Sequence, residues 1–354
     1  MLLHQIKPTA TESALNPMDI PVYAGRLTAL PILLLNIHTL CNCHCVMCDI
    51  WKRKESQELI ASGLERHRDS LKNLAVRQVV LSGGEPLLNR DLQAICEFFR
   101  SLNIRITLLT TGLLLQKRAG LVASLVDDVI LSLDGPPEVH NSIRRVSKAF
   151  EMIALGVETV RKLHPGMPLS CRTTVQKKNH THLRATVQAA HSLDLNSISF
   201  LAADLSSTAF NRDQPWQPER QNEIALSFAE LHALEAEIEL LIANHQADIH
   251  TRFIAEDAAK LRRLPARFRE HIEDSPPQAP ACNAPWVSTV MEVDGTLRPC
   301  FFHAPVASTE NASLEQALNS HAARLFRAGL NVAMNPTCRR CVCSLNYRAT
   351  AVAP

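Results

Sequence analysis

Residues 33–48 read LLLNIHTLCNCHCVMC, an apolar run that stops just before a group of four cysteines. A short apolar run of this kind is typical of a buried β-strand. Cys41, Cys45 and Cys48 follow it with the spacing C-x3-C-x2-C. A loop so spaced can wrap three thiolates around three irons of a cubane cluster and leave the fourth iron without a protein ligand. The stretch therefore predicts a metal centre directly after the first strand.

A zinc loop is the alternative interpretation of the same residues, with the four cysteines and His44 as ligands. Structural zinc sites normally take their ligands from two paired sets, whereas this loop supplies one crowded set. Cys43 lies outside the three-cysteine pattern. The spacing favours a cluster, and the zinc alternative stays open.

Strand and helix patterns alternate from the first strand to about residue 204. Short apolar runs recur at residues 33–38, 78–82, 104–110, 129–133, 170–175 and 197–201. Apolar stripes with helical spacing lie between some of them, at residues 92–102, 150–160 and 183–190. Repeated strand–helix units predict a parallel sheet whose functional residues lie at the carboxyl ends of the strands. We expect an α/β fold, a partial (β/α)6 TIM-like barrel with a small cysteine-rich C-terminal domain.

The cysteine loop resembles the signature of the radical S-adenosylmethionine superfamily, including a bulky residue, Met47, before the third cysteine. The resemblance implies that Cys41, Cys45 and Cys48 hold a catalytic [4Fe–4S] cluster. It also implies that the open iron binds S-adenosylmethionine, whose reductive cleavage yields a 5′-deoxyadenosyl radical, and that Met47 packs near the adenine.

The segment SGGEP at residues 82–86 follows the second strand and resembles the family's GGEP motif. Gly83 and Gly84 allow the backbone to approach a ligand closely. The resemblance implies that Glu85 and nearby carbonyls accept hydrogen bonds from the ammonium group of S-adenosylmethionine. Without the cysteine loop before it, this segment would be interpreted as a turn.

The segment SLDG at residues 132–135, followed by His140 and Arg144, resembles a pattern of relatives that carry extra clusters. The resemblance implies that Ser132 and Arg144 contact the ribose and the carboxylate of the cofactor. The alternative is a tight turn at the Asp-Gly-Pro sequence, with Arg144 on a solvated helix.

A second cysteine group lies in the last quarter of the chain, with a hairpin and its Asp-Gly turn predicted at residues 291–299. The order of these cysteines resembles the auxiliary-cluster region called SPASM, or its shorter form called twitch. The resemblance implies one auxiliary [4Fe–4S] cluster with Cys343 as a spare or substitute ligand and four main ligands, Cys282, Cys300, Cys338 and Cys341. A zinc ribbon built from the same four cysteines is the alternative.

The sequence divides into four predicted parts: a loose leader (1–30), the barrel (31–204), a helical connector (205–280) and the iron–sulfur domain (281–354). The connector contains an amphipathic helix over residues 228–241 and otherwise matches no motif. The formal net charge is only +2, which argues against nucleic acid or an anionic membrane as the main partner. No signal peptide or stretch long enough for a membrane helix is recognised, so we expect a cytoplasmic protein.

These features predict a radical enzyme that abstracts hydrogen from a small polar metabolite, such as a carbohydrate, aminocyclitol or nucleoside, with net oxidation or epimerisation. About 30 residues precede the first strand, too few for the peptide-recognition domain that peptide modifiers of the family often carry. A SPASM-type maturase of a ribosomal peptide is the first alternative, and a non-catalytic iron–sulfur or zinc-binding module is the second. The resemblance implies a reductant of the flavodoxin or ferredoxin type. No general acid or base is assigned.

Overall fold

The computed structural model describes residues 25–273 and 277–348, so most of the predicted leader lies outside the described residues. Six parallel strands form the barrel sheet in the order β6-β5-β4-β3-β2-β1. All six predicted strands are confirmed, as is the partial barrel. They are β1 (Ile32–His38), β2 (Gln78–Gly83), β3 (Arg105–Thr110), β4 (Asp128–Ser132), β5 (Leu169–Val175) and β6 (Ser197–Ala202).

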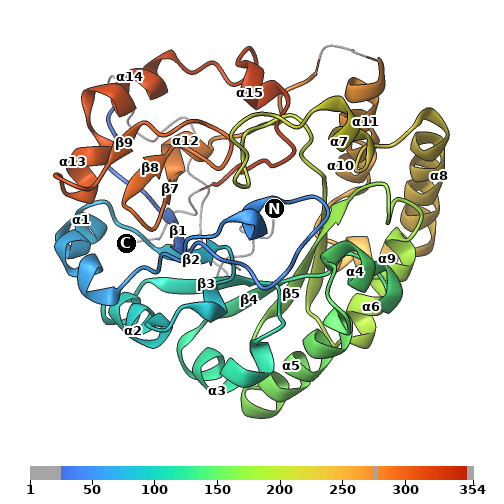
Figure 1. The fold of residues 1–354 in the computed structure, drawn as a ribbon, viewed down its shortest axis with the longest axis horizontal. Coiled ribbons are helices and arrows are strands. Elements are labelled where there is room, and N and C mark those ends of the chain that lie inside the picture. The colour runs from blue at the N-terminus through green and yellow to red at the C-terminus, as the bar shows by residue number, and fades with distance from the viewer. Residues whose placement is uncertain (1–24, 274–276, 349–354) are drawn as a thin grey trace.

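Helices cover the outer face of this sheet (Figure 1). The predicted stripes are confirmed as α2, α5 and α6, and the stripe residues Leu92, Ile95 and Phe99 of α2 are fully buried. The helices of this part are α1 (Arg68–Asn73), α2 (Leu92–Ser101), α3 (Leu115–Leu125), α4 (Pro137–Arg144), α5 (Ala149–Leu163) and α6 (Leu183–Ser192). Short 3₁₀ helices are η4 (Ile50–Lys52), η5 (Ala61–His67) and η6 (Pro86–Leu88).

The described residues after β6 contain several helices, and the helix predicted over residues 228–241 is confirmed as α8. It is the longest of them and begins with a capping box in which the Ser227 side chain and Glu230 satisfy each other's backbone N–H groups. This helix packs against α6 and α11. The connector helices are α7 (Pro218–Asn222), α8 (Phe228–Asn244), α9 (Gln246–His250), α10 (Ala258–Leu261) and α11 (Leu264–Glu273).

The C-terminal region extends the barrel sheet. Strand β7 (Ser288–Met291) runs parallel to β1, and β8 (Thr296–Arg298) and β9 (Ala307–Ser308) continue the sheet antiparallel. The β7–β8 pair is the predicted hairpin, with Gly295 at a φ of +82° in its turn. Four short helices complete the region: α12 (Ala284–Val287), α13 (Leu314–Leu318), α14 (His321–Gly329) and α15 (Pro336–Arg339).

This architecture brings the sequence motifs to one end of the barrel, because they follow the carboxyl ends of parallel strands. The cysteine loop follows β1, the Gly-Gly-Glu-Pro segment follows β2, and the Asp134 turn follows β4. Among the described helices, none combines the length and the apolar character that a membrane span requires.

Candidate active site

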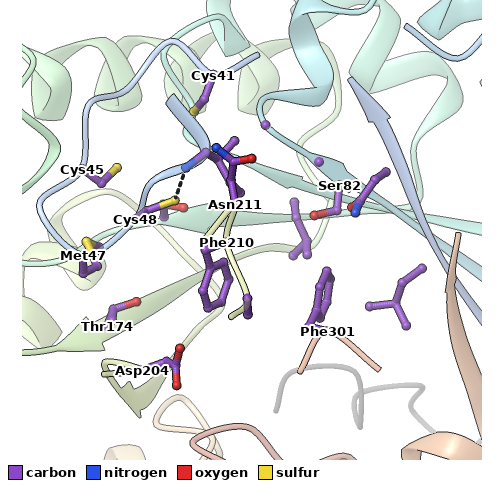
Figure 2. A pocket seen from close by; sticks show the side chains of 18 of the residues that line it. Cys41, Cys45, Met47, Cys48, Ser82, Thr174, Asp204, Phe210, Asn211 and Phe301 are labelled. Carbon is purple, nitrogen blue, oxygen red and sulfur yellow. Dashed lines mark hydrogen bonds between the residues drawn. The ribbon is translucent and has the colours of Figure 1, made fainter. Parts of the chain in front are cut away.

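A cavity of about 460 Å³ lies at the carboxyl ends of the strands. The three cysteines of the loop lie on one side of it, and Phe301 from the C-terminal region lies on the other (Figure 2). The cavity is of a size that small-molecule sites occupy. Eight of the residues predicted to bind the catalytic cluster or the cofactor line it together: Cys41, Cys45, Cys48, Met47, Gly83, Gly84, Ser132 and Arg144.

The cysteine loop is fastened to the end of α4 by two backbone hydrogen bonds. His44 N–H donates to the Arg144 carbonyl (3.1 Å), and Val46 N–H donates to the Ile143 carbonyl (3.0 Å). Cys43, directly before these anchor points, is 1% exposed and belongs to the hydrophobic core. Cys43 is therefore absent from the cavity lining, although its thiol forms a hydrogen bond with the neighbouring Cys45.

The three cavity cysteines differ in their surroundings. Burial raises the pKa of the Cys41 thiol to about 12 and that of Cys48 to about 12. A hydrogen bond from Cys43, helped by the Arg144 guanidinium 3.4 Å from the Cys45 Sγ, lowers the pKa of Cys45 to about 6. Buried thiols ligate metals in the deprotonated form, and the metal then supplies the compensating charge. Three soft sulfur donors beside an open cavity therefore fit an iron–sulfur cluster with room for one further ligand.

Gly83 and Gly84 let the turn after β2 lie directly against the start of the cysteine loop. A Cβ atom on Gly84 would lie 1.9 Å from the Leu40 carbonyl oxygen, and one on Gly83 would lie 2.4 Å from the His38 carbonyl oxygen. Gly83 also adopts a φ of +127°, which favours glycine. Because the two backbones lie so close, the Gly84 N–H donates to the His38 carbonyl (2.7 Å). The two glycines therefore line the cavity and also seat the cysteine loop on the sheet.

Glu85 has other partners than the cofactor ammonium expected from the sequence. Its side chain is fully buried, and its carboxylate accepts from the Thr110 hydroxyl (2.6 Å), the Thr111 N–H (2.7 Å) and the Leu87 N–H (3.0 Å). Burial raises the pKa of Glu85, and these donors oppose that effect. Glu85 is absent from the cavity lining and ties the turn after β2 to the end of β3. Its role in cofactor binding stays a prediction.

Arg144 lies in the cavity wall and is only 7% exposed, so the alternative of a solvated helix arginine is wrong. Its guanidinium pairs with the fully buried Asp134 at 2.6 Å. Met47 also lies in the cavity wall, and its sulfur is 3.5 Å from the Gln176 amide nitrogen. Contacts of Arg144, Ser132 and Met47 with the cofactor stay predictions.

Residues 204–222 pack against the cysteine loop. No sequence motif had indicated this contact. Arg212 pairs with Asp204 at 2.7 Å, with both side chains almost fully buried, and donates to the Met47 carbonyl (3.4 Å). The Arg212 guanidinium lies 3.6 Å from the centre of the Trp216 ring, whose Nε1–H donates to the Asp49 carboxylate (2.6 Å). This segment therefore holds the end of the loop that carries Cys48.

The same segment also supplies cavity residues that sequence reasoning missed. Asp204, Phe210 and Asn211 line the cavity, and Figure 2 shows Phe210 and Asn211 beside Cys48. The available signal was the combination of two aromatic residues and one arginine in FNRDQPW at residues 210–216, in the segment that follows β6.

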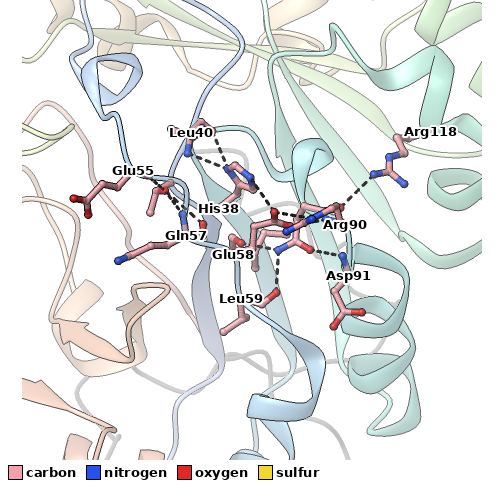
Figure 3. A network of polar contacts seen from close by, with 12 residues as sticks. His38, Leu40, Glu55, Gln57, Glu58, Leu59, Arg90, Asp91 and Arg118 are labelled. Atoms are coloured by element: carbon pink, nitrogen blue, oxygen red, sulfur yellow. Dashed lines mark hydrogen bonds and ion pairs between the residues drawn. The ribbon is translucent and has the colours of Figure 1, made fainter.

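A network on the other side supports the first residues of the loop (Figure 3). The Leu40 N–H donates to His38 Nδ1 (3.0 Å). Asn89, fully buried, donates to the carbonyls of Ile37 (2.7 Å) and Leu59 (3.0 Å). The loop is thus held at its start, at its middle and at its end by three different elements.

The second cysteine group surrounds a much smaller space, of about 20 Å³. Cys282, Cys300, Cys338 and Cys341 all line it, which is the set of ligands expected from the sequence. His303 lines it too, with its Nε2 3.3 Å from the Cys338 Sγ. Four thiols around one small space fit a cluster ligated entirely by protein.

Cys343 lines the main cavity together with Val342 and is absent from the lining of the small space, although its backbone carbonyl accepts a hydrogen bond from the Cys341 thiol (2.7 Å). Burial raises the pKa of the Cys343 thiol, and the positive charge of Arg172 on β5 opposes this effect. The geometry therefore groups Cys341, and not Cys343, with the other three cysteines. Within the described residues, no three His, Cys, Asp or Glu side chains lie close enough to hold a single metal ion.

Two family models match the chain, and each contains one of the cysteine groups. The radical SAM superfamily model matches residues 35–187, and the iron–sulfur cluster-binding domain called SPASM matches residues 282–342. The partial barrel, the two cysteine groups and the two family matches together define the chain as an iron–sulfur protein with a partial (β/α) barrel. The chain contains a radical SAM domain and a SPASM-type C-terminal region. These domains support a catalytic [4Fe–4S] cluster, S-adenosylmethionine and an auxiliary cluster, and they favour iron over zinc at both groups.

Curated relatives match parts of the chain. The AdoMet-dependent heme synthase of Methanosarcina barkeri is 30% identical over 158 residues, which are 43% of this chain and 45% of the relative. A probable GTP 3′,8-cyclase of Methanococcus maripaludis is 32% identical over 128 residues, 35% of this chain and 43% of the relative. The chain therefore spans less than half the length of these relatives.

Solved structures share the fold over most of the chain. SuiB of Streptococcus suis bound to the precursor peptide SuiA has a TM-score of 0.65 at 14% identity, covering 91% of this chain and 73% of SuiB. The structure of native anSMEcpe with bound AdoMet has a TM-score of 0.59 at 18% identity, covering 84% of this chain and 83% of anSMEcpe. At such low identity the likeness concerns the fold alone.

Proposed function

We propose that the protein is a radical S-adenosylmethionine enzyme that abstracts hydrogen from a small polar molecule. The observation that carries this proposal is the shared cavity. Its lining includes the three cysteines of the loop, the glycines after β2 and polar side chains from the C-terminal region. A cofactor bound at the cysteines and a substrate bound against the C-terminal region would therefore occupy one continuous space.

The residues of the loop fit the catalytic cluster by their chemistry. Cys41, Cys45 and Cys48 would hold it, and the backbone exposed at Gly83 and Gly84 would lie along the cofactor. When bound, the cluster and S-adenosylmethionine supply a 5′-deoxyadenosyl radical. The contribution of the chain is to position the reactants and, through Phe210 and Phe301 in the cavity wall, to exclude water from them.

The proposal extends to the second cluster and to the electron donor. Cys282, Cys300, Cys338 and Cys341 would ligate an auxiliary [4Fe–4S] cluster fully. A flavodoxin or ferredoxin would supply electrons, as the family relation implies. Neither nucleic acid nor membrane belongs to the proposal.

The character of the cavity supports a small substrate. Asn36, Glu292 and Arg298 give the cavity polar and charged walls. The relatives named above are a heme synthase and a GTP cyclase by title. The carbohydrate, aminocyclitol or nucleoside class expected from the sequence gains no support from the comparisons and stays a prediction. A peptide substrate is the second candidate, favoured by the fold shared with peptide-bound SuiB.

The test combines metal content with cofactor cleavage in anaerobically purified protein. Wild type should contain about eight irons per chain and form 5′-deoxyadenosine when reduced, since each cubane holds four irons. The triple Cys41, Cys45, Cys48→Ala variant should lose about four irons and all 5′-deoxyadenosine formation. Cys96→Ala, which removes a buried cysteine of α2 outside both groups, is the matched control and should retain both. If the wild type contained zinc and little iron, the proposal would be wrong and the protein would be a non-catalytic zinc-binding module.

Deuterium transfer distinguishes the two substrate classes. Deuterated small molecules and deuterated peptides would each be mixed with reduced enzyme, and the deuterium content of 5′-deoxyadenosine would be measured by mass spectrometry. Transfer from peptides and from none of the small molecules would replace the first candidate with the second.

A further inference from the structure

The arginines that line the main cavity differ in how their charge is balanced. Three of them face carboxylates: Arg144 with Asp134 (2.6 Å), Arg212 with Asp204 (2.7 Å) and Arg298 with Glu292 (3.1 Å). Arg53 is exposed to solvent and donates to the Asn211 amide oxygen (2.7 Å). The fifth, Arg172, has neither a carboxylate nor full access to water.

Arg172 is partly buried, and its hydrogen bonds are incomplete. Its Nε donates to the Ser199 hydroxyl at 3.5 Å, near the limit for a hydrogen bond. One terminal nitrogen is buried without a hydrogen-bond partner, and no described carboxylate lies within ion-pair distance of the guanidinium. Burying a charge without a partner destabilises the folded protein. We therefore expect the Arg172 guanidinium to pair with a bound ligand when the protein functions.

The position of Arg172 on β5 directs its side chain into the cavity. Successive side chains of a strand alternate between the faces of the sheet, so Arg172 shares its face with Thr174. Both line the cavity, and Figure 2 shows Thr174 in the cavity wall. Its direct neighbours in the sheet are Ser132 on β4 and Ser199 on β6, whose small side chains leave space around the guanidinium.

Arg172 lines the same cavity as Glu292, Arg298 and Phe301 of the C-terminal region. A planar guanidinium with free donors matches the paired oxygens of a carboxylate or a phosphate. The cofactor positions implied by the family lie along the cysteine loop, Gly84, Ser132 and Arg144. Arg144 already has its own carboxylate, whereas Ser132 is the direct neighbour of Arg172 in the sheet, so the cofactor carboxylate is the anion that competes with the substrate for Arg172.

We propose that Arg172 binds an anionic group of the substrate, a carboxylate or a phosphate, in the cavity that it shares with the C-terminal region. This assignment rests on the proposed function and narrows its substrate to small molecules that carry a negative charge. It makes Arg172 a specificity-determining residue.

The experiment measures thermal unfolding of anaerobically reconstituted protein with S-adenosylmethionine present. Citrate is the carboxylate probe, inorganic pyrophosphate is the phosphate probe, and sodium chloride at equal ionic strength is the blank. A probe that binds the folded state raises the unfolding midpoint in a saturable way. Wild type should respond to at least one probe, and the probe that acts tells which of the two anions the site takes.

Arg172→Met should abolish this response. In the absence of probe its midpoint should equal or exceed that of wild type, because the substitution removes an unpaired buried charge at a functional site. Arg105→Met is the matched control, since Arg105 is a strand arginine that pairs with Asp128 at 2.9 Å outside the cavity. That variant should unfold at a lower temperature than wild type and keep the probe response.

Two results would overturn the assignment. A wild type that ignores both probes, with Arg172→Met unfolding at a lower temperature, would make Arg172 a structural residue. Loss of S-adenosylmethionine binding in Arg172→Met, measured by equilibrium dialysis, would assign the anion to the cofactor instead. Failure of the proposed function is a separate result: wild type that responds to a probe but forms no 5′-deoxyadenosine keeps the anion site and loses the radical chemistry.

Discussion

The two cysteine groups of this protein differ in number, in setting and in what supports them. The first has three cysteines on the wall of a cavity of about 460 Å³, whereas the second has four around a space of about 20 Å³. The first loop is held by outside elements: the end of α4, the turn after β2 and the segment after β6. Three thiols beside a large space leave one coordination position for a ligand from outside, and four around a small space leave none. The comparison teaches that the size of the space beside the cysteines, and not only their number, distinguishes a catalytic cluster site from a fully ligated one.

The largest effect should come from removing a cysteine of the second group, whose four thiols surround the small space. Cys341→Ala removes one of its four thiols and should lower the iron content by about four per chain, leaving the first cluster. Cys343→Ala is the matched control two residues away and should keep all the iron, because Cys343 lines the other cavity. Iron analysis of the two variants decides the point, and the reverse pattern would make Cys343 the ligand.

The next effect concerns the segment behind the first loop. Arg212→Met should lower the free energy of unfolding by about 3–5 kcal/mol, because it leaves Asp204 buried without its partner. Arg262→Met, which removes an arginine paired with Glu239 on the surface, should leave stability nearly unchanged. Denaturant unfolding of both variants measures the difference. Equal losses would contradict a supporting role for the buried pair.

A smaller effect is expected at the glycine turn. Gly84→Ala would force a Cβ to within 1.9 Å of the Leu40 carbonyl oxygen and should cost about 1–3 kcal/mol by overpacking. The displaced loop should also hold less iron at the first site. Gly63→Ala meets nothing within 4 Å and should leave both quantities at wild-type values. Unfolding midpoints and iron content of the pair would be compared, and a wild-type iron content in Gly84→Ala would show that the close approach does not seat the loop.

The smallest effect should come from the surface edge of the network in Figure 3. The Arg90 side chain is 87% exposed and donates to Glu58 (3.0 Å). Arg90→Ala should change the free energy of unfolding by less than about 0.5 kcal/mol, because exposed ion pairs contribute little. A loss as large as that of Gly84→Ala would mean that the loop is supported from the surface as well.

The sequence predicted the barrel strands because they are short runs rich in apolar or β-branched residues, and it predicted α2 because its apolar residues form a clear stripe. Helix α3 was missed, since its buried positions, Leu115, Ala119 and Val122, are interspersed with polar and small residues. The pairing of β7 with β1 left no local signal, because strands that meet across most of the chain share no sequence pattern.

The candidate site shows the same division. The cysteines and glycines were found from their spacing, which is a local property of the chain. The contacts of Glu85 and the charge balance of Arg172 depend on which residues lie nearby in space. Those contacts come from β3 in the first case and from β4, β6 and the C-terminal segment in the second. Such relations become visible only once the fold has been built.

The parallel pairing of β1 with β7 has a consequence for the order in which the molecule assembles. The Asn36 amide donates to Glu292 (2.8 Å) across a sequence separation of 256 residues. During synthesis, one edge of β1 therefore stays unpaired until most of the chain has left the ribosome, and contacts between such distant residues form slowly. The sheet around the strand that leads into the cysteine loop is thus completed only after the segment that carries β7 has been synthesised.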